Sequence, residues 1–445
     1  MTTTETTLAH VLPVTAAVNN AGHLTIADCD VVELAREFGT PLYVYDEETL
    51  RGQCRAFRKA FESRYPNTGV AYAAKAFLGR AMAAIAAEEG MYMDVVSGGE
   101  LAIAASVNFP ADRIFFHGNN KSEQELIEAL DYGVGRIVID NFYEMQLLNG
   151  LAQARGTKQK VLVRLSPGID PHTHAHTTTG TTDNKFGIPI AAGGQGEAAV
   201  RSAREMPGLE LMGLHVHLGS PIFELEPYAK AVDVVCDFAA QMRDKYDFEM
   251  QEFSPGGGFA VAYTADQLPP SPDAYAEVIV PPLKAACARH GLQEPRLTIE
   301  PGRSIVARSG VALYTVGSSK EVPGLRRWVS VDGGMADNIR PAMYDSGYAA
   351  VVANKANDDR RETVTVAGKY CESGDVLIKD AELPPLETGD VIALPASGGY
   401  NLAMASNYNA SQRPAVVLAQ DGEAKLIRRR ETYEDLMSCD VWPLE

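Results

Sequence analysis

Positive charge is scarce in this sequence of 445 residues. Its 40 lysines and arginines stand against 58 aspartates and glutamates, for a net charge of -18. Such a surplus of negative charge disfavours nucleic acid and anionic membranes as partners. No uninterrupted apolar stretch reaches about 18 residues, and the start, MTTTETTLAHVLPV, has no basic region before an apolar core. We therefore expect no nucleic-acid partner, no membrane span and no targeting segment.

Cysteine is also sparse. The six cysteines form no CxxC pair and have no regular spacing, so we expect reduced thiols rather than a disulfide framework. Reduced thiols are typical of the cytoplasm, which is where we expect the protein to act. The chain has no internal repeat, and its length is sufficient for two or three domains.

Short apolar runs recur through the first two thirds of the chain. There are eight between residues 70 and 303: VAYAAK at 70, MYMDVVS at 91, RIFFHG at 113, RIVID at 136, KVLVRLSP at 160, LMGLHVHLG at 211, FSPGGG at 253 and LTIEPG at 297. Most segments between them have helical spacing, as in GRAMAAIAAEEG from 79, SEQELIEALDYG from 122 and YAKAVDVVCDFAAQMRDKY from 228. Alternation of strand and helix indicates a parallel sheet.

Such a sheet is either an open doubly wound sheet or a barrel of eight strands ringed by helices. The span of roughly 235 residues is close to the ~250 that a barrel of this kind takes. No GxGxxG follows the first run, and polar residues stand at the C-terminal ends of nearly all runs, as barrel active sites require. These residues are Lys75, Asp94, His117, Asp140, Arg164, His217 and Glu300. We therefore predict an α/β fold with a (β/α)8 TIM barrel over residues 46–310.

The pattern changes beyond the barrel. Residues 311–445 contain strand-like pieces such as GVALYTVGSS, ETVTVAG and RPAVVLAQDG, separated by Gly, Pro and Asp turns. This pattern predicts a C-terminal all-β domain. Residues 1–45 also contain strand and turn patterns, in HLTIADCD and PLYVYD, and we expect them to pack with the β domain.

Lys75 ends the first run and Glu300 ends the eighth. A desolvated lysine is an amine that forms Schiff bases, and a carboxylate beside a pyridinium nitrogen keeps a pyridoxal ring protonated as an electron sink. The ordinary alternatives are an exposed lysine and a rim salt bridge between Glu300 and Arg303. In a closed barrel the first and eighth strands are neighbours, so we expect both residues on the same rim.

Two loops follow the seventh and eighth strands, PGGGF at 255–259 and EPGR at 300–303. These loops are the usual phosphate site of such barrels, because backbone N–H groups there approach an anion without obstruction. Three glycines alone also fit a tight turn. The coincidence with the eighth-strand loop favours phosphate binding.

The segment HVHLGS places His215 and His217 on one face of a strand, since side chains alternate with period two. Zinc ligation is one interpretation, and HTHAH at 172–176 is a further source of ligands. We expect no metal, however, because no strand supplies a further histidine set and HTHAH has the surroundings of a lid loop. An imidazole stacked on a flat cofactor, with Ser220 donating to its phosphate, suits the sequence better.

The segment GKYCESGD at 368–375 places Cys371 beside Glu372. Free cysteines are most often inert packing groups. The polar residues next to Cys371 argue against a position in the centre of a buried strand. A loop thiol near a cation can serve as a proton donor.

In this order, the motifs resemble the diaminopimelate decarboxylases, which belong with ornithine decarboxylase and alanine racemase to the fold-type III pyridoxal phosphate enzymes. The resemblance runs from YVYD at 43 to RPAVVL at 413. Its most specific stretches are YAAKA, DVVSGGE, the TG and KFG of TTTGTTDNKFG, HVHLGS, GGGF, EPGR, DGGMADNIRPAMY at 332–344, CESGD at 371–375 and GGYNLAMASNYN at 398–409. SGGY at 397–400, and Lys369 with Tyr370 before Cys371, depart from the residues usual in the family.

The resemblance implies a pyridoxal 5'-phosphate cofactor and a role for each matching residue. Lys75 would hold the cofactor as a Schiff base, His217 would stack on the ring and Glu300 would meet the ring nitrogen. The other implied cofactor-binding residues are Asp94, Ser220, Gly256, Gly257, Gly258, Pro301, Gly302, Arg303 and Tyr400. Arg303, Arg340, Tyr344 and Tyr400 would bind substrate, with the first three on its distal carboxylate. Glu372 would hold the distal amino group and Cys371 would donate a proton, so the implied catalytic residues are Lys75, His217 and Cys371.

The implied activity is decarboxylation of meso-2,6-diaminopimelate to L-lysine and carbon dioxide, the last step of lysine biosynthesis. The family also implies a homodimer in which Cys371 and Glu372 reach the partner's barrel. One alternative is a decarboxylase of another amino acid or of a carboxylated polyamine, which would be expected to lose the Arg340 and Tyr344 pairing or Glu372. Another is an inactive cofactor-binding homologue, which should lack Lys75 or Cys371. The chain has all five residues.

Overall fold

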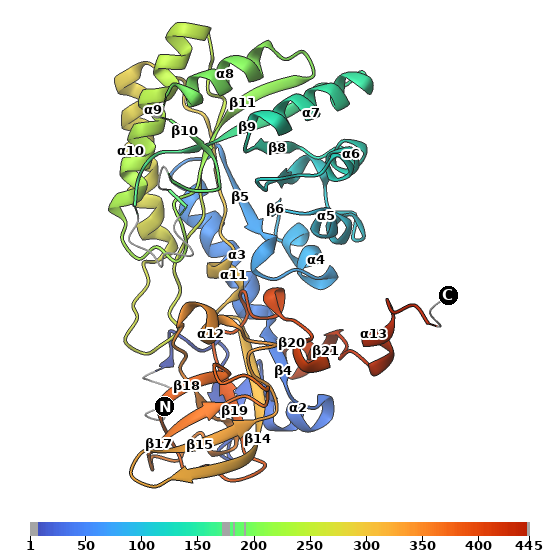
Figure 1. The fold of residues 1–445 in the computed structure, drawn as a ribbon. Helices are drawn as coiled ribbons and strands as arrows, with labels where there is room; N and C mark the ends of the chain where they lie inside the picture. The colour runs from blue at the N-terminus through green and yellow to red at the C-terminus, as the bar shows by residue number, and fades with distance from the viewer. Residues whose placement is uncertain (1–7, 171–178, 181–182, 191–192, 443–445) are drawn as a thin grey trace. The chain divides into compact units, whose positions relative to one another are not determined.

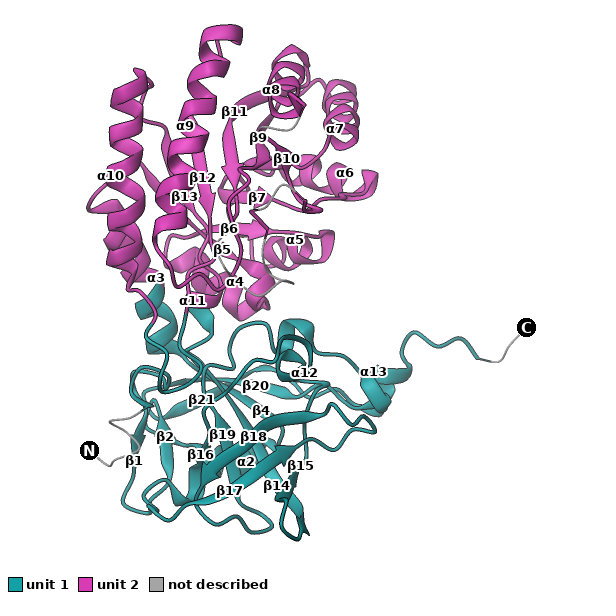
Figure 2. Ribbon diagram, turned by 60° about the vertical axis from the view of Figure 1, so that its left-hand side comes forward, with its two compact units in different colours: residues 1–53, 261–268, 305–445 teal, residues 54–260, 269–304 magenta. Residues whose placement is uncertain are grey.

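The computed structural model describes residues 8–170, 179–180, 183–190 and 193–442. The chain divides into two compact units (Figure 2). The β unit comprises Met1–Gln53, Val261–Leu268 and Ile305–Glu445, and the barrel unit comprises Cys54–Ala260 and Pro269–Ser304. Two helices, α3 (Glu47–Glu62) and α11 (Arg303–Val306), each cross a boundary between the units.

Eight parallel strands form the closed sheet of the barrel unit. They are β5 (Thr68–Ala73), β6 (Tyr92–Val95), β7 (Ile114–Phe116), β8 (Arg136–Ile139), β9 (Gln159–Ser166), β11 (Leu209–Val216), β12 (Glu252–Gly256) and β13 (Arg296–Ile299). The sheet closes because β13 pairs with β5 and β8 pairs with β9. A two-residue strand, β10 (Ile188–Pro189), adds to β9. The predicted barrel is confirmed, and its eight strands are the eight apolar runs of the sequence.

Helices follow most of these strands and surround the sheet (Figure 1). They are α4 (Arg80–Glu88), α5 (Gly98–Ala105), α6 (Glu123–Tyr132), α7 (Phe142–Ala154), α8 (Gln195–Glu205), α9 (Glu226–Tyr246) and α10 (Pro272–His290). Helix α6 shows how the sequence sets such limits. Ser122 and Glu125 form a reciprocal capping box at its start, and Gly133 ends it in the left-handed conformation.

The barrel core consists of apolar side chains from neighbouring strands. Phe115, Val138, Leu162 and Met212 form one buried cluster, against which Tyr92 packs. They come from β7, β8, β9 and β11, so the cluster ties consecutive strands together. Burial of each such side chain contributes about 1.5–3 kcal/mol, which keeps the strand ends at the rim in fixed positions.

The β unit is built on a mixed sheet in the order β18-β17-β15-β14-β4-β20-β21. Its strands are β4 (Leu42–Asp46), β14 (Gly310–Val322), β15 (Arg326–Val331), β17 (Glu362–Ala367), β18 (Val376–Leu383), β20 (Ala415–Gln420) and β21 (Glu423–Arg428), and β19 (Val391–Leu394) pairs with β14 and β16 (Val351–Val352). The N-terminal strand β4 lies between β14 and β20, which confirms that the N-terminal segment joins the β domain.

Smaller elements complete the β unit. A three-stranded sheet is formed by β1 (Ala17–Val18), β2 (Leu24–Ile26) and β3 (Cys29–Asp30), and the short helices are α2 (Val31–Phe38), α12 (Arg340–Tyr344) and α13 (Tyr433–Met437). The six cysteines of the chain are free thiols, and only Cys371 and Cys439 are exposed. Among the described residues, no helix combines the length and apolar character needed to cross a membrane.

Candidate active site

The first strand of the barrel leads directly to Lys75. A 3₁₀ turn, η1 (Ala74–Ala76), follows β5 and carries this residue. The Nζ of Lys75 lies 3.0 Å from Oδ2 of Asp94 on β6. The Asp94 side chain is 0% exposed and that of Lys75 is 40% exposed. A buried carboxylate therefore orients an accessible amine at the C-terminal end of the barrel strands, where a Schiff-base lysine is needed.

Glu100 is a second carboxylate near this pair, and the sequence analysis gave it no role although it ends the DVVSGGE motif. It lies in the first turn of α5, where its backbone N–H donates to the N-cap hydroxyl of Ser97 at 3.2 Å. Its Oε2 accepts a hydrogen bond from the N–H of Val96 at 2.7 Å. Burial raises the pKa of Glu100 to about 7, although the Val96 bond opposes the shift. The S-x-x-E spacing of SGGE is the sequence signal for such a helix start.

Glu300 follows β13 and is held by three side chains inside the barrel. Ser254 Oγ donates to its Oε1 at 2.9 Å, and His215 Nε2 lies 3.0 Å from its Oε2. The Nε2 of His117 lies 3.5 Å from Oε1. Burial would raise the pKa of Glu300, but His215 and His117 outweigh it and lower the pKa to about 2. The carboxylate is therefore ionised at neutral pH.

The two buried histidines beside Glu300 also resemble a metal site. Their rings lie 4.9 Å apart in an edge-to-face arrangement. His117, His215 and Glu300 each offer one ligand atom, all within 4.8 Å of one another, which is a spacing that three-ligand metal sites show. The pair that the sequence suggested, His215 with His217, does not make this cluster. The segment 172–176 lies outside the described residues.

The glycines at 256–258 form a loop that admits no side chains. Gly256 and Gly258 have φ of +80° and +96°. An added Cβ at Gly257 would lie 2.1 Å from the backbone oxygen of Glu300. The N–H of Gly257 donates to Nδ1 of His217 at 3.2 Å. The burial of His217, with the charges of Lys75 and Arg164, lowers its pKa well below the usual value, so its imidazole is neutral.

The EPGR loop packs against the first strand. The N–H of Ala73 donates to the carbonyl of Pro301 at 3.1 Å, and a Cβ added at Gly302 would lie 2.8 Å from that of Ala73. The next residue, Arg303, donates from Nε to Oγ of Ser220 at 3.1 Å. The barrel unit thus brings together most of the predicted cofactor residues: Lys75, Asp94, His217, Ser220, Gly256, Gly257, Gly258, Glu300, Pro301, Gly302 and Arg303.

The β unit carries the other predicted residues. Arg340, at the start of α12, is 5% exposed, and its guanidinium carbon lies 5.8 Å from the ring centre of Tyr344. Tyr400 has a φ of +65°, a conformation that is uncommon for a residue with a side chain. Cys371 and Glu372 are exposed in a loop before β18. The predicted site residues are therefore divided between the two units.

Asp375 holds the loop that contains Cys371. Its Oδ1 accepts the N–H of Met335 at 2.7 Å and its Oδ2 accepts the N–H of Tyr370 at 2.8 Å. Added Cβ atoms at Gly334 and Gly368 would lie 2.4 and 2.1 Å from this carboxylate. In addition, the N–H of Cys371 donates to Oδ1 of Asn409 at 2.9 Å. The thiol is exposed, but its backbone is fixed.

The barrel residues fit pyridoxal phosphate, which the family implies. The amine of Lys75 and the ionised carboxylate of Glu300 follow the neighbouring strands β5 and β13, where they can hold the two ends of a pyridine ring. The glycine loop offers backbone N–H groups without side chains, and Arg303 and Ser220 offer polar side-chain atoms suited to a phosphate. These residues therefore offer hydrogen-bond donors for the anionic phosphate and an ionised carboxylate for the ring nitrogen, and the cofactor requires both.

Comparisons with known proteins agree with this geometry. Residues 47–307 match the family described as "Pyridoxal-dependent decarboxylase, pyridoxal binding domain". The chain is 46% identical over 427 residues to the diaminopimelate decarboxylase of Bacillus subtilis, covering 96% of this chain and 97% of that protein. It is 44% identical over 443 residues to the enzyme of Synechocystis, covering 98% and 93%.

Solved structures give the same result. The diaminopimelate decarboxylase from M. jannaschii in complex with L-lysine superposes with a TM-score of 0.90 at 35% identity, covering 96% of this chain and 98% of that one. The Helicobacter pylori enzyme complexed with L-lysine has a TM-score of 0.83 at 31% identity, covering 91% and 98%. The resemblance found in the sequence motifs is thus confirmed, and the chain belongs to the diaminopimelate decarboxylases within the pyridoxal-dependent decarboxylase family.

Proposed function

We propose that the protein removes one carboxylate from meso-2,6-diaminopimelate as carbon dioxide and releases L-lysine. The observation that carries the substrate assignment is the guanidinium of Arg340. It is buried, and no carboxylate of the described residues forms an ion pair with it. Since buried charges in proteins are normally paired, this cation is suited to an anionic group of a substrate.

The barrel unit would bind the cofactor. Lys75, oriented by Asp94, is the residue that would hold it, while Glu300 would meet the ring nitrogen and His217 would lie against the ring. Ser220, the glycines 256–258 and the loop 301–303 would bind the phosphate, with Tyr400 from the β unit. Bound pyridoxal phosphate supplies an electron sink for the bond between Cα and the departing carboxylate.

The β unit would bind the far end of the substrate. Arg340 and Tyr344, with Arg303, would hold the carboxylate that is retained in the product, and Glu372 would hold the amino group beside it. Departure of carbon dioxide leaves an electron pair on Cα, which must take up one proton. The exposed thiol of Cys371 is the proposed donor of that proton.

The substrate is tested by carbon dioxide release from purified protein and cofactor. We expect release from meso-diaminopimelate and none from ornithine, arginine or carboxynorspermidine. Release from one of the others alone would identify a different decarboxylase. The Lys75→Ala variant should lose both this activity and the visible absorbance of the bound cofactor, and survival of that band would remove Lys75 from its role.

We also propose a homodimer in which Cys371 and Glu372 serve the partner's barrel. The exposure of both residues supports this arrangement. The test mixes Lys75→Ala and Cys371→Ala chains, each inactive alone. Mixing should restore about a quarter of the wild-type activity, because half of the dimers are mixed and each has one intact site. No recovery would place both residues in the site of one chain. The free thiols support a cytoplasmic location for the enzyme.

A further inference from the structure

The guanidinium of Arg340 is held along one edge by two hydroxyl groups. Its Nε donates to the hydroxyl of Tyr348 at 2.9 Å, and its Nη2 donates to Oγ of Ser346 at 3.2 Å. These two nitrogens form the side edge of the guanidinium fork. A guanidinium has five N–H donors, and within the described part of the chain the end edge formed by Nη1 and Nη2 keeps two parallel donors for a ligand.

A third residue determines the direction of the first hydrogen bond. The hydroxyl of Tyr348 donates its single proton to Oδ1 of Asn401 at 3.2 Å. It therefore presents a lone pair, not a proton, to Nε of Arg340. Tyr348 is 4% exposed and Asn401 is 1% exposed, so water has little access to this chain of bonds.

Aromatic rings limit the position of the guanidinium further. Its central carbon lies 4.8 Å from the ring centre of Tyr263. The ring of Tyr263 packs edge-to-face on that of Tyr348, with 5.3 Å between centres and 76° between planes. The N–H of Ala349 donates to the carbonyl of Tyr263 at 2.8 Å, which fixes that ring's backbone to the segment carrying Tyr348.

The surroundings of Arg340 keep its positive charge without neutralising it. Burial lowers the pKa of Arg340, whereas the hydrogen bond that its Nε donates to the Tyr348 hydroxyl raises it. Burial also raises the pKa of Tyr348, so the phenol is neutral at physiological pH. Dipoles and π faces stabilise the cation, and no described carboxylate cancels it.

We propose that Tyr348, oriented by Asn401 and packed on Tyr263, is a positioning and specificity-determining residue that aims the end edge of the Arg340 guanidinium at one carboxylate of the substrate. This inference rests on the proposed function, in which Arg340 binds the distal carboxylate. It also explains why the enzyme would select a substrate with a distal carboxylate. A guanidinium fixed at its side edge binds a planar carboxylate through two parallel hydrogen bonds, whereas a rotating one does so less often.

Three ligands that differ in their carboxylates can test this selectivity. Diaminopimelate has two carboxylates, and decarboxylation removes one, so L-lysine still has the carboxylate that Arg340 would bind. Cadaverine is the diamine that remains when lysine loses its carboxylate. If the Arg340 guanidinium is no longer held in place, the affinities for diaminopimelate and lysine should therefore fall together, and the affinity for cadaverine should not change.

The experiment uses the full-length, cofactor-loaded enzyme with the Tyr348→Phe substitution. We expect KM for diaminopimelate and the inhibition constant of L-lysine each to rise about tenfold, as for loss of a hydrogen bond to a charged group. The kcat and the cofactor absorbance should change less than twofold, and cadaverine should inhibit as before. An unchanged KM, or an equal loss of cadaverine affinity, would overturn the proposal.

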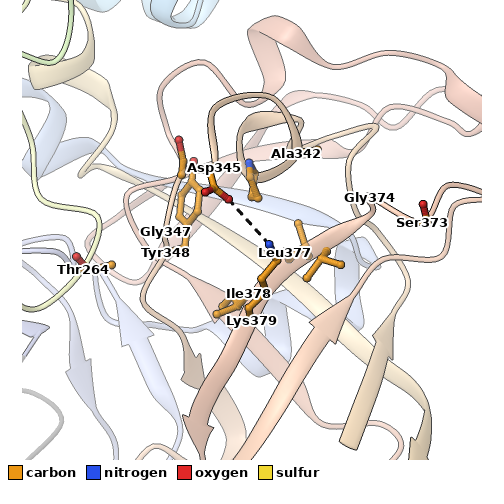
Figure 3. Close-up of a pocket in the computed structure, with 13 residues that line it drawn as sticks. Thr264, Ala342, Asp345, Gly347, Tyr348, Ser373, Gly374, Leu377, Ile378 and Lys379 are labelled. Carbon is orange, nitrogen blue, oxygen red and sulfur yellow. Dashed lines mark ion pairs between the residues drawn. The ribbon is translucent and has the colours of Figure 1, made fainter. Parts of the chain in front are cut away.

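A matched control lies on the same face of the β unit. Ser346 and Tyr348 line a cavity of about 540 Å³ together with Asp345 and Lys379 (Figure 3). Lys379 is a cation whose Nζ lies 4.0 Å from Asp345, and its side chain is 67% exposed. Lys379→Gln should leave all three ligands unaffected. If it weakened diaminopimelate as much as Tyr348→Phe does, general electrostatics and not orientation would be responsible.

Two outcomes separate this inference from the proposed function. A wild-type enzyme inactive on diaminopimelate would contradict the function itself. If the wild type is active and the Tyr348→Phe variant has an unchanged KM for diaminopimelate, only the role of Tyr348 would be contradicted. If Tyr348→Phe does not fold, Ser346→Ala removes the other bond of the same edge and should raise KM about threefold, again with kcat unchanged; an unchanged KM there would overturn the proposal.

Discussion

The Nε2 atom of His215 lies 3.0 Å from Oε2 of Glu300, and both side chains are buried in the barrel. An ionised carboxylate only accepts hydrogen bonds, so the histidine must carry its proton on Nε2. A carboxylate buried without such a donor would tend to become neutral. His215 therefore keeps Glu300 in the form that a protonated ring nitrogen needs.

We predict that His215→Leu weakens cofactor binding by about tenfold or more, because a hydrogen bond to a charged group is worth about 1.5–3 kcal/mol. The measurement is a titration of the cofactor-free protein with pyridoxal phosphate, followed by absorbance. The control is His290→Gln, at the end of α10, where the ring pairs with Asp237. Equal affinities of the His215→Leu variant and the wild type would show that Ser254 and His117 suffice to hold Glu300.

Gly257→Ala should disturb the same site by displacing the backbone beside Glu300. The added methyl group would lie 2.1 Å from the Glu300 carbonyl oxygen, so one of the two loops must move. Overpacking of this kind costs about 1–3 kcal/mol, and we expect at least tenfold weaker cofactor binding.

Gly150→Ala is the matched control for that substitution. An added Cβ at Gly150, on α7, meets nothing within 4 Å. Alanine should stabilise this helix by about 0.5–1 kcal/mol. Should both variants bind the cofactor as the wild type does, the glycine loop has more freedom than the contact distances indicate.

Glu100→Gln should change how stability depends on pH. The pKa of Glu100 is about 7 in the folded protein against an ordinary value of 4.5, so the folded state binds the proton more tightly than the unfolded state does. The stability that this proton contributes is complete below about pH 4.5 and is lost as the pH rises through 7. Glutamine does not titrate. As the pH rises between these values, the free energy of unfolding of the variant should therefore increase relative to that of the wild type by up to about 3 kcal/mol.

The measurement for Glu100 is a series of melting curves of the cofactor-free protein at pH 5, 7 and 9. Glu205→Gln, an exposed substitution at the end of α8, should shift the melting temperature by the same small amount at each pH. A constant difference between Glu100→Gln and the wild type across the series would contradict the raised pKa.

Asp375→Asn should loosen the loop of Cys371. An asparagine has one acceptor oxygen, so it can keep the bond to Met335 or the bond to Tyr370 but not both. We expect faster alkylation of Cys371 by iodoacetamide and roughly tenfold lower kcat, as for a lost buried hydrogen bond of about 1–3 kcal/mol. A Cys439→Ser background leaves Cys371 as the one exposed thiol among the five remaining cysteines.

The control for Asp375 is Asp359→Asn, an exposed substitution in the same unit. Identical alkylation rates for Asp375→Asn and its parent would mean that Asn409 alone fixes the loop. A lower kcat without faster alkylation would instead indicate a direct effect of the charge of Asp375.

The sequence was sufficient for the barrel because each strand lies in a short, largely apolar run that is mostly buried, and segments with helical spacing separate most of these runs. It was less informative for the β unit. The predicted pieces there omitted β18, where only two of the eight residues are buried, and β21, where none is. In EAKLIR of β21, polar and apolar residues alternate over only four residues before the adjacent pair Leu426 and Ile427 breaks the pattern.

Site residues could be predicted where they stand at strand ends or in contiguous motifs. Ser254 and Tyr348 could not, because their importance comes from contacts with residues far along the chain. The bond between Tyr348 and Asn401 joins positions 53 residues apart, and although Asn401 stands in GGYNLAMASNYN, no local pattern connects it with Tyr348. His215 was noted, but as a possible partner of His217, since strand periodicity gives the face of a residue and not its partner across the barrel.

The position of β4 in its sheet has a consequence for synthesis of the chain. Its two neighbours are β14 and β20, and β20 begins at Ala415. At translation rates of roughly 5–20 residues per second, one edge of β4 stays without its native neighbour for tens of seconds after it is made. An unpaired strand edge is a template for aggregation. Newly made chains that stop before residue 415 should therefore depend on chaperones more than full-length chains do.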